Sequence, residues 1–211
     1  MENPVIIFGA IGLGKVALEI FKSNEVIVYG FLDDDKKLHG QEIDDVQIMG
    51  STEDEQFLKV LGTKCEAFIA VDDNRLKKSL VKMLNEDYKV MPVNAFHATS
   101  FISPTAVLGH GNLISAGAVV NTFAKVGNHC IVNTKAVIDY EAVLADFVQI
   151  GAGAIVGAGA KIGESAFVGA GVTIVSGITV GKNARIGAGS LVMQNVADGE
   201  TVFGVPAQKV K

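Results

Sequence analysis

Residues 137–168 read VIDYEAVLADFVQIGAGAIVGAGAKIGESAFV, and an aliphatic residue stands at every sixth position of this stretch. The spacing continues without interruption from residue 102 to residue 192. The sixteen positions are Ile102, Leu108, Ile114, Val120, Val126, Val132, Ile138, Leu144, Ile150, Val156, Ile162, Val168, Ile174, Val180, Ile186 and Val192. The 3.6-residue period of a helix does not keep such a set on one face, and the two-residue period of a strand does not by itself select every sixth residue. The repeat therefore decides the fold of the second half of the chain.

A period of six describes one short strand followed by one turn. A second inward position lies four residues after each aliphatic one and is usually small, as at Ala106, Ala118, Ala124, Cys130, Ala136, Ala142, Ala154, Ala160, Ala166, Ala184 and Ser190. The position directly after the aliphatic residue often holds a residue that tolerates turns, as at Gly109, Asn121, Gly127, Asn133, Asp139, Gly151, Gly163 and Gly181. Three units make a triangular coil, and stacked coils bury a continuous column. Sixteen hexads predict a parallel β-helix of about five coils, roughly 25 Å long.

The first half of the chain predicts a small α/β domain. Residues 4–21 read as an apolar strand, a turn with Gly9, Gly12 and Gly14, and a helix from about Lys15. Glycines at a helix amino terminus let the backbone approach a phosphate. Their spacing, G-x-x-G-x-G, differs from the dinucleotide pattern, so NAD, a sugar nucleotide and a structural turn all stay open at this point.

Acidic residues follow two further predicted strands of this domain. Residues 25–35 end in Asp33, Asp34 and Asp35, and residues 66–74 end in Asp72-Asp73-Asn74. Strand ends that meet at one edge of a parallel sheet form the usual ligand crevice, where acidic groups contact a ribose or a base. The run from Asp33 to Asp35 is equally compatible with a solvated turn.

Two helices are predicted between the later strands. Residues 51–61, with Ser51 and Asp54 spaced like a capping box, and residues 75–84 have the pattern of crossover helices. The change of composition and hydrophobic periodicity between the halves predicts a Rossmann-like domain over 1–93, a linker over 94–101 and a β-helix with a carboxyl-terminal tail over 102–211.

Composition and charge exclude several classes of partner. The net charge is −5 and there is no run of Lys and Arg, which argues against nucleic acid or an anionic membrane as the main partner. The amino terminus has no cationic segment before its short apolar run, and no stretch has the length of a membrane span, so a cytoplasmic protein is expected. Cys65 and Cys130 are too few and too far apart for a disulfide framework or a zinc site, and both are expected to be buried fillers without any metal.

The motifs of both halves, taken in order, resemble a known family. The glycine turn, FLDDD, the linker sequence NAFHATSFISPTA, the hexads and the closing VFGVPAQKV are similar to nucleotide-sugar N-acetyltransferases of the bacillosamine and sialic-acid sugar acyltransferase type. The resemblance covers essentially the whole chain. It implies a left-handed β-helix, a homotrimer with acetyl-CoA in the groove between neighbouring β-helices, and a UDP-linked amino sugar held by the first domain.

The resemblance also assigns roles to individual residues. In the catalytic region, Tyr140 stands in the place of the base, Glu141 in that of the acid that raises its basicity, and Asn133 matches an active-site asparagine. The residues implied for acetyl-CoA are Gln149, Ala158, Ala170 and Ala188. Those implied for the nucleotide sugar are Gly12, Leu13, Gly14, Asp33, Asp34 and Asp73, with a contribution around Asp72.

Three histidines of the family pattern are replaced, by Tyr140, Leu13 and Gln149. A tyrosine has a reference pKa near 10 and does not readily accept a proton at neutral pH, and a neighbouring carboxylate opposes phenolate formation. Either Glu141 acts as the base, or Tyr140 donates a hydrogen bond while positioning does most of the work. His97 in the linker is a further candidate.

His110 and His129 are expected to be exposed turn residues on another side of the coil from Tyr140. The leading hypothesis is acetyl transfer from acetyl-CoA to the amine of a UDP-linked amino sugar with an altered base. Alternatives are O-acyl transfer, a non-catalytic sugar-nucleotide-binding or scaffold member of the family, and a purely structural β-helix trimer. The sequence does not choose the sugar or the acyl group.

Overall fold

The computed structural model describes residues 3–210, which form two compact units. The first unit ends at Ala98 and the second begins at Thr99. None of the helices in this described part has the length and hydropathy of a membrane-spanning segment.

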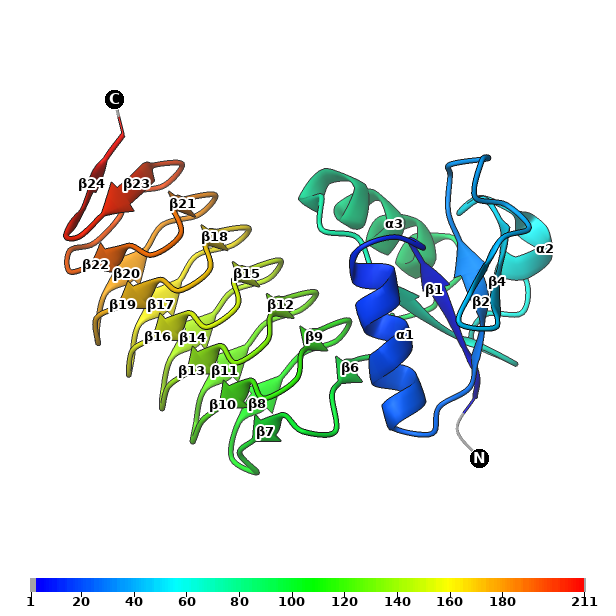
Figure 1. The fold of residues 1–211 in the computed structure, drawn as a ribbon, viewed down its shortest axis with the longest axis horizontal. Coiled ribbons are helices and arrows are strands. Elements are labelled where there is room, and N and C mark those ends of the chain that lie inside the picture. Colours follow the sequence, from blue (N-terminus) through cyan, green and yellow to red (C-terminus); the bar gives the residue numbers. More distant parts are fainter. Residues whose placement is uncertain (1–2, 211) are drawn as a thin grey trace. The chain divides into compact units, whose positions relative to one another are not determined.

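The first unit contains a five-stranded sheet with the order β3-β4-β2-β1-β5 (Figure 1). Its strands are β1 (Val5–Phe8), β2 (Val28–Leu32), β3 (Glu42–Ile43), β4 (Val46–Gly50) and β5 (Glu66–Ile69). Its helices are α1 (Leu13–Ser23), α2 (Glu55–Leu58) and α3 (Asn74–Glu86), and a two-residue strand β6 (Ala95–Phe96) follows. The strands pair in parallel except for the antiparallel hairpin of β3 and β4.

Apolar packing holds helix α1 against the sheet. All four residues of β1 are buried, and α1 buries Ala17, Leu18, Ile20 and Phe21. The Phe21 ring meets that of Phe68 edge to face, with centroids 5.5 Å apart. Such pairs add about 0.5–1.5 kcal/mol to the burial of apolar area. The α/β prediction for this unit is confirmed.

The predicted helix over residues 51–61 is wrong in extent and in its cap. Helix α2 has only four residues, and its cap is Asp54, whose carboxylate accepts the Gln56 N–H at 3.0 Å. The segment before it is tied elsewhere, because the Thr52 N–H and hydroxyl both donate to the carboxylate of Asp34 at 2.9 Å. This contact with the end of β2 keeps the backbone around Ser51 out of the helix.

The second unit is a left-handed parallel β-helix, as predicted (Figure 1). Its three sheets have the orders β22-β19-β16-β13-β10-β7, β20-β17-β14-β11-β8 and β24-β23-β21-β18-β15-β12-β9. The strands are β7 (Phe101–Ile102), β8 (Val107–Leu108), β9 (Leu113–Ile114), β10 (Val119–Val120), β11 (Lys125–Val126), β12 (Ile131–Val132), β13 (Val137–Ile138), β14 (Val143–Leu144), β15 (Gln149–Ile150), β16 (Ile155–Val156), β17 (Lys161–Ile162), β18 (Phe167–Val168), β19 (Thr173–Ile174), β20 (Thr179–Val180), β21 (Arg185–Ile186), β22 (Leu191–Val192), β23 (Thr201–Gly204) and β24 (Ala207–Lys209). We refer to the three sheets, in this order, as faces one, two and three.

The predicted inward column forms the core of the β-helix. The second residue of each hexad strand points inward, and every such residue from Ile114 to Val192 is buried. Ile102 and Leu108, in the first coil, are half-buried. The small inward residues are also inaccessible to solvent, as at Ala118, Ala136 and Ala154. Cys130 takes one of these places, and both cysteines are buried, as predicted.

The turn of each hexad lies two residues later than predicted. From Leu108 to Ile186, the left-handed backbone conformation occurs three residues after each inward aliphatic residue, at Gly111, Gly117, Phe123, His129, Lys135, Glu141, Phe147, Gly153, Gly159, Ser165, Gly171, Gly177, Asn183 and Gly189. The position directly after the aliphatic residue is small for another reason. A Cβ atom on Gly163 would lie 2.6 Å from the backbone nitrogen of Lys182, in the next coil. Glycine is needed there for close stacking, and a left-handed turn is not involved.

Replacing Gly163 should therefore destabilise the β-helix through the contact between coils. We expect Gly163→Ala to lower the free energy of unfolding by about 1–3 kcal/mol, because Lys182 has to shift. Gly159→Asn is the matched control: Gly159 has a φ of 64° with nothing within 4 Å of the added Cβ. Asparagine tolerates this conformation at about 1 kcal/mol or less. Urea unfolding followed by circular dichroism measures both, and equal effects would contradict the assignment.

Candidate functional site

A crevice opens at the carboxyl ends of β1, β2 and β5 in the first unit. It has a volume of 360 Å³. Its lining residues are Gly9, Ile11, Gly12, Leu13, Asp33, Ala70, Val71, Asp72, Asp73 and Leu76. We call it the glycine-turn crevice. Its place is the one at which parallel α/β sheets bind ligands.

The glycines shape the turn that forms one wall of the crevice. Gly9 has a φ of 101°, and a Cβ atom there would lie 2.9 Å from the carbonyl oxygen of Ala70. A Cβ on Gly14 would collide with the carbonyl of Gly9. Gly12 is the N-cap of α1 and has no side chain to cap it. The N–H groups of Gly14 and Lys15 donate to the carbonyls of Ile11 and Gly12 at 3.0 and 3.2 Å. The N–H groups of Gly12 and Leu13 have no acceptor among residues 3–210 and remain available to an anion.

Asp33 connects the glycine turn to the end of β2. Its Oδ2 accepts the N–H of Ala10 at 2.8 Å, and its Oδ1 accepts the N–H of Asp35 at 3.0 Å. The Nε2 atom of His39 lies 2.7 Å from the backbone carbonyl oxygen of Asp33. The carboxylate is thus oriented by the backbone on two sides while it lines the crevice.

The other predicted substrate-binding residues divide into two groups. Gly12, Leu13 and Asp73 line the crevice, and Asp73 also caps α3 by accepting the N–H groups of Arg75 and Leu76 at 2.9 Å. Gly14 is buried behind the turn, and Asp34 faces Thr52. Neither is among the residues that line the crevice.

The chemistry of the crevice is acidic with an apolar rim. Three carboxylates, of Asp33, Asp72 and Asp73, line it, and its lining includes no Lys or Arg. Ile11 and Leu76, which the sequence analysis missed, are 63% and 43% exposed. Their only signal in the sequence was their place beside the glycine turn and beside Asp73. The arrangement suits a ligand that donates hydrogen bonds from hydroxyl or N–H groups and has a flat apolar part.

In the β-helix, Tyr140 and Glu141 form the corner between β13 and β14. Tyr140 is 53% exposed, and Glu141 is exposed with a φ of 58°. The corner is stacked by backbone hydrogen bonds: the Glu141 N–H donates to Thr122 at 3.0 Å, and the Gly159 N–H donates to Tyr140 at 2.9 Å. No hydrogen bond involves the Tyr140 hydroxyl within the described range 3–210.

A short polar ladder supports this corner. The Oδ1 atom of Asp139 accepts the Tyr140 N–H at 2.8 Å and the side-chain amide of Asn121 at 3.1 Å. The Oδ1 atom of Asn121 in turn accepts the Thr122 N–H at 2.8 Å. Asn121 and Asp139 were predicted only as turn residues, and both fix the backbone that carries Tyr140.

The remaining predicted residues lie at other places on the coil. Asn133 is at the corner between β12 and β13, where its side-chain amide donates to the carbonyl of Ile150 at 3.0 Å. Ala170 and Ala188 directly follow β18 and β21, so they lie at this same corner in later coils. Ala158 lies at the corner of Tyr140, one coil further along. Gln149 begins β15 on face three. Face one separates the two corners by about 20 Å, the span of one extended hexad.

His129 departs from its predicted exposure. It occupies a turn, but only 6% of its surface is exposed, and its ring stacks on that of Phe147 with centroids 5.1 Å apart. Phe147 takes the equivalent turn position one coil further along, so the two rings fill the same corner. His110 is exposed as predicted, and His97 is half-buried.

Metal-binding side chains do not cluster in this part of the chain. Among residues 3–210, no group of three or more His, Cys, Asp or Glu side chains is arranged to hold a metal ion.

Burial raises the pKa of the Cys65 thiol above its usual value.

Two sequence-family models match separate parts of the chain. Residues 4–84 match the PglD N-terminal domain, and residues 159–194 match the bacterial transferase hexapeptide repeats. No curated protein sequence matches the chain.

Solved structures match the chain over its whole length. A variant of GDP-perosamine N-acetyltransferase from Caulobacter crescentus, in complex with CoA and GDP-perosamine, is 28% identical with a TM-score of 0.91, and the match covers 100% of this chain and 98% of that one. The acetyltransferase domain of PglB from Neisseria gonorrhoeae, in complex with acetyl coenzyme A, is 27% identical with a TM-score of 0.90, and the match covers 100% of both chains. These whole-length structural homologues are acetyltransferases.

A third structure, WeeI from Acinetobacter baumannii, shares the fold at 21% identity. Its TM-score is 0.80, and the match covers 99% of this chain and 100% of that one. The homologues whose structures contain ligands bind CoA or acetyl-CoA, and one of them also binds a nucleotide sugar.

The double role of Asp33 gives a stability prediction. We expect Asp33→Ala to lower the free energy of unfolding by about 1–3 kcal/mol, because the N–H groups of Ala10 and Asp35 lose a charged acceptor. Lys36→Ala, an exposed change in the same loop, is the control and should stay within about 0.5 kcal/mol of the native protein. Denaturant unfolding compares the two, and an unchanged Asp33→Ala would show that the turn holds without this carboxylate.

Proposed function

We propose that the protein transfers an acetyl group from acetyl-CoA to the amine of a UDP-linked amino sugar. The observation that carries the proposal is the presence, in one chain, of the glycine-turn crevice and the β-helix. The chain that contains both matches one acetyltransferase in complex with CoA and GDP-perosamine and another in complex with acetyl-CoA. The crevice takes the nucleotide and the β-helix takes acetyl-CoA.

The crevice suits a nucleotide because its carboxylates and the positive end of a helix dipole face different parts of the ligand. Asp33, Asp72 and Asp73 accept hydrogen bonds from the ribose hydroxyls and the base, while the amino terminus of α1, with Gly12 and Leu13, faces the diphosphate. Without a lysine or arginine in the lining, the backbone supplies most of the phosphate contacts. The proposal takes UDP as the nucleotide, and GDP is the alternative that the perosamine structure suggests.

A homotrimer explains why the proposed acyl-transfer residues lie at two corners. Tyr140, Glu141 and Ala158 occupy one corner, and Asn133 with Ala170 occupies the other, about one hexad away. A single β-helix does not bring them together. In the proposed trimer the first corner of one subunit faces the second corner of its neighbour, and acetyl-CoA lies between them with Gln149 and Ala188.

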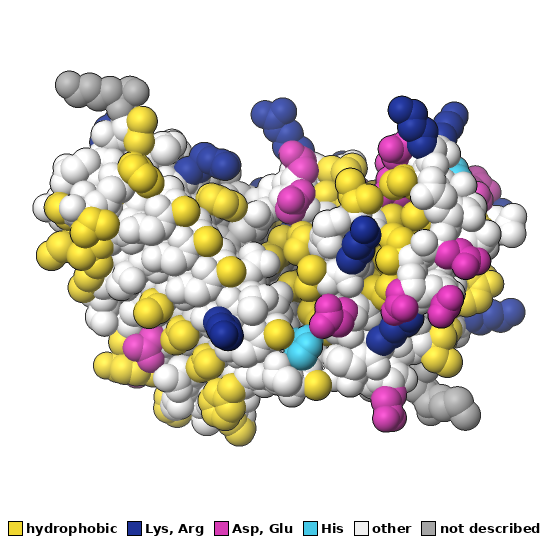
Figure 2. Space-filling view, viewed as in Figure 1, with side chains coloured by type: hydrophobic (Ala, Val, Ile, Leu, Met, Phe, Trp, Pro, Cys, Tyr) yellow, Lys and Arg dark blue, Asp and Glu magenta, His cyan; other side chains and the backbone are white. Residues whose placement is uncertain are grey.

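An apolar surface supports association of the β-helices. Hydrophobic side chains are frequent on the visible surface of the second unit, whereas charged side chains gather over the first (Figure 2). On face one the outward residues are Phe101, Val119, Val137, Ile155, Thr173 and Leu191. Phe101 and Ile155 are 55% and 43% exposed in the single chain. Contiguous apolar surface of this kind marks a site of association.

The proposed reaction needs a nucleophile, a proton acceptor and a donor to the thioester oxygen. The amine nitrogen bonds to the carbonyl carbon, the C–S bond breaks, and the amine proton passes through Glu141 to the CoA sulfur. The phenol O–H of Tyr140 donates a hydrogen bond to the thioester oxygen. Asp139 and Asn121 hold the turn that presents both side chains.

The decisive experiment measures thiol release from acetyl-CoA with a panel of UDP-linked and GDP-linked amino sugars. The proposal expects release that depends on a UDP-linked amino sugar. Release with GDP-linked sugars alone would correct the nucleotide, and release with no sugar of the panel would overturn the enzyme proposal. Mass spectrometry of the product separates an amide from a base-labile ester, and so N-transfer from O-transfer.

Variants at the corner separate the two proposed roles. Glu141→Gln should lower kcat by about 10²–10⁴-fold, since it removes the proton acceptor. Tyr140→Phe should lower kcat by about tenfold, the value of one hydrogen bond to a developing charge. Tyr140→His restores a group that accepts a proton near neutral pH; a rise in kcat with this variant would show that the native residue is a weaker catalyst. Unchanged kcat in both Glu141→Gln and Tyr140→Phe would place the chemistry elsewhere, with His97 the next candidate.

A second candidate function is binding without catalysis. It is favoured by Tyr140, an exposed phenol at the place where a proton acceptor is needed. Such a protein would bind the nucleotide sugar in calorimetry and release no thiol. A purely structural trimer would bind neither the nucleotide sugar nor acetyl-CoA.

The proposed trimer is tested by placing a charge on face one. Ile155→Lys places a charge on the apolar face one and should shift the protein from trimer to monomer in sedimentation velocity. Val107→Lys, on face two and 62% exposed, is the matched control and should leave the trimer intact. A native protein that sediments as a monomer at micromolar concentration would overturn the trimer.

A further inference from the structure

A second pocket lies in the first unit, at the opposite edge of its sheet from the glycine-turn crevice. It has a volume of 720 Å³. Its lining residues are Asn3, Val5, Phe21, Asn24, Val26, Glu66, Val93, Asn94 and Phe96. Val5 and Glu66 are the first residues of β1 and β5, so the pocket opens at the amino ends of these strands. We call it the amino-edge pocket.

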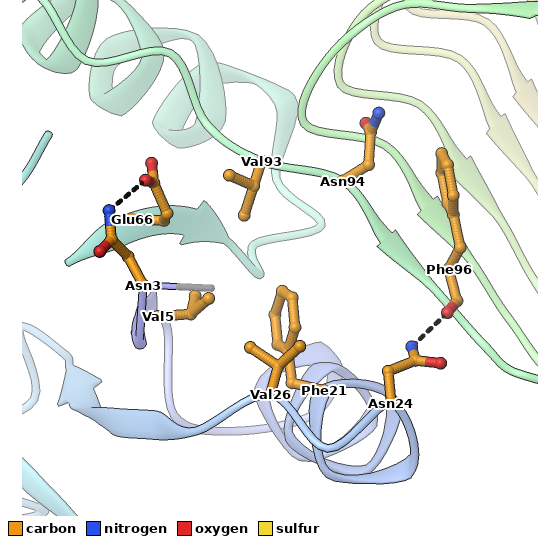
Figure 3. Close-up of a pocket in the computed structure, with 9 residues that line it drawn as sticks. All are labelled: Asn3, Val5, Phe21, Asn24, Val26, Glu66, Val93, Asn94 and Phe96. Carbon is orange, nitrogen blue, oxygen red and sulfur yellow. Dashed lines mark hydrogen bonds between the residues drawn. The ribbon is translucent and has the colours of Figure 1, made fainter. Parts of the chain in front are cut away.

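The pocket has an apolar floor between two polar sides (Figure 3). Figure 3 shows Phe21, Val26 and Val93 in the middle, with the pair of Asn3 and Glu66 on one side. Asn24, Asn94 and Phe96 lie on the other side. A volume within about 300–1,000 Å³, with an apolar floor and a few polar groups, is typical of a small-molecule site.

Existing hydrogen bonds hold the polar side chains in place. The side-chain amide of Asn3 donates to Oε1 of Glu66 at 3.0 Å. The amide of Asn24, at the end of α1, donates to the carbonyls of Ile20 at 3.0 Å and Phe96 at 2.7 Å. Both side-chain N–H groups of Asn24 and one of the two of Asn3 are thus engaged within the protein.

The acceptors on the same side chains are not engaged. Counting only partners within residues 3–210, Oε2 of Glu66 and Oδ1 of Asn3 and of Asn24 make no hydrogen bond. The pocket lining contains one acidic side chain and no basic one. A complementary ligand therefore supplies several hydrogen-bond donors, carries positive charge and has an apolar face.

We propose that the amino-edge pocket binds an amino sugar that carries no phosphate, separately from the nucleotide in the glycine-turn crevice. The ring hydroxyls and the ammonium group donate to Glu66, Asn3 and Asn24, and the C–H face of the ring lies on Phe21 and the valines. Glu66 repels phosphorylated and nucleotide-linked sugars, which keeps this site distinct from the crevice. The site does not depend on acyl transfer.

The test uses glucosamine as the probe and the full-length protein. Isothermal titration at neutral pH, with NMR of the valine methyl groups, should show weak saturable binding that shifts Val26 and Val93. Glucosamine 1-phosphate should bind at least tenfold more weakly because of its negative charge. N-acetylglucosamine, which lacks the ammonium group, should also bind more weakly.

Two variants locate the site. Glu66→Gln keeps the acceptor for Asn3 and removes the charge, and it should weaken glucosamine binding by about tenfold or more without changing nucleotide binding. Asp73→Asn, in the glycine-turn crevice, is the control and should leave glucosamine binding unchanged. Circular dichroism confirms that both variants fold.

Three outcomes would overturn the proposal. They are the lack of glucosamine binding at millimolar concentration, binding that leaves the methyl signals of Val26 and Val93 unshifted, and equal affinity in the native protein and Glu66→Gln. Competition between glucosamine and UDP would also overturn it, since the two sites would then be one. None of these outcomes bears on thiol release, so the acyltransferase proposal is tested independently.

Discussion

The stacking of coils in a fixed register is the constraint on which the β-helix depends. Each coil donates and accepts backbone hydrogen bonds from the next one, as between the Val137 N–H and the Ala154 carbonyl at 2.8 Å. A slip of one residue would turn the whole aliphatic column to the solvent. The register therefore fixes every position outside the column as well, and Tyr140 and Glu141 stand at a corner because Ile138 must point inward.

Most of the residues proposed for acyl transfer lie at corners of the coil. The interior is filled by aliphatic side chains, and the faces are flat strands only two residues long. Each corner from Gly111 to Gly189 contains one left-handed residue, which costs about 1 kcal/mol when it is not glycine. Glu141, His129 and Phe147 keep this conformation because backbone hydrogen bonds to neighbouring coils hold the chain there.

The first unit is organised by a different constraint, the need to satisfy backbone groups at the ends of strands and helices. Asp33 and Asp73 line the crevice and at the same time accept backbone N–H groups. Asp34, next in sequence to Asp33, braces the segment of Thr52 instead. Acidic residues that look uniform in the sequence are thus divided into carboxylates that line the crevice and one, of Asp34, that does not. At the other edge of the sheet, Glu66 and Asn24 line a second pocket.

The sequence by itself determined the β-helix, because a period of six over sixteen hexads allows one arrangement in which all the aliphatic residues are buried. It also determined the α/β unit and its glycine turn, since strand, turn and helix patterns are local. Only the tertiary structure decided that α2 has four residues, that the left-handed turn falls at Glu141 and its equivalents, and that His129 is buried against Phe147. Each of these depends on a side chain or backbone group from a distant part of the chain. Local pattern carries no record of such contacts, and the amino-edge pocket, built from segments as far apart as Asn3 and Phe96, is invisible to it for the same reason.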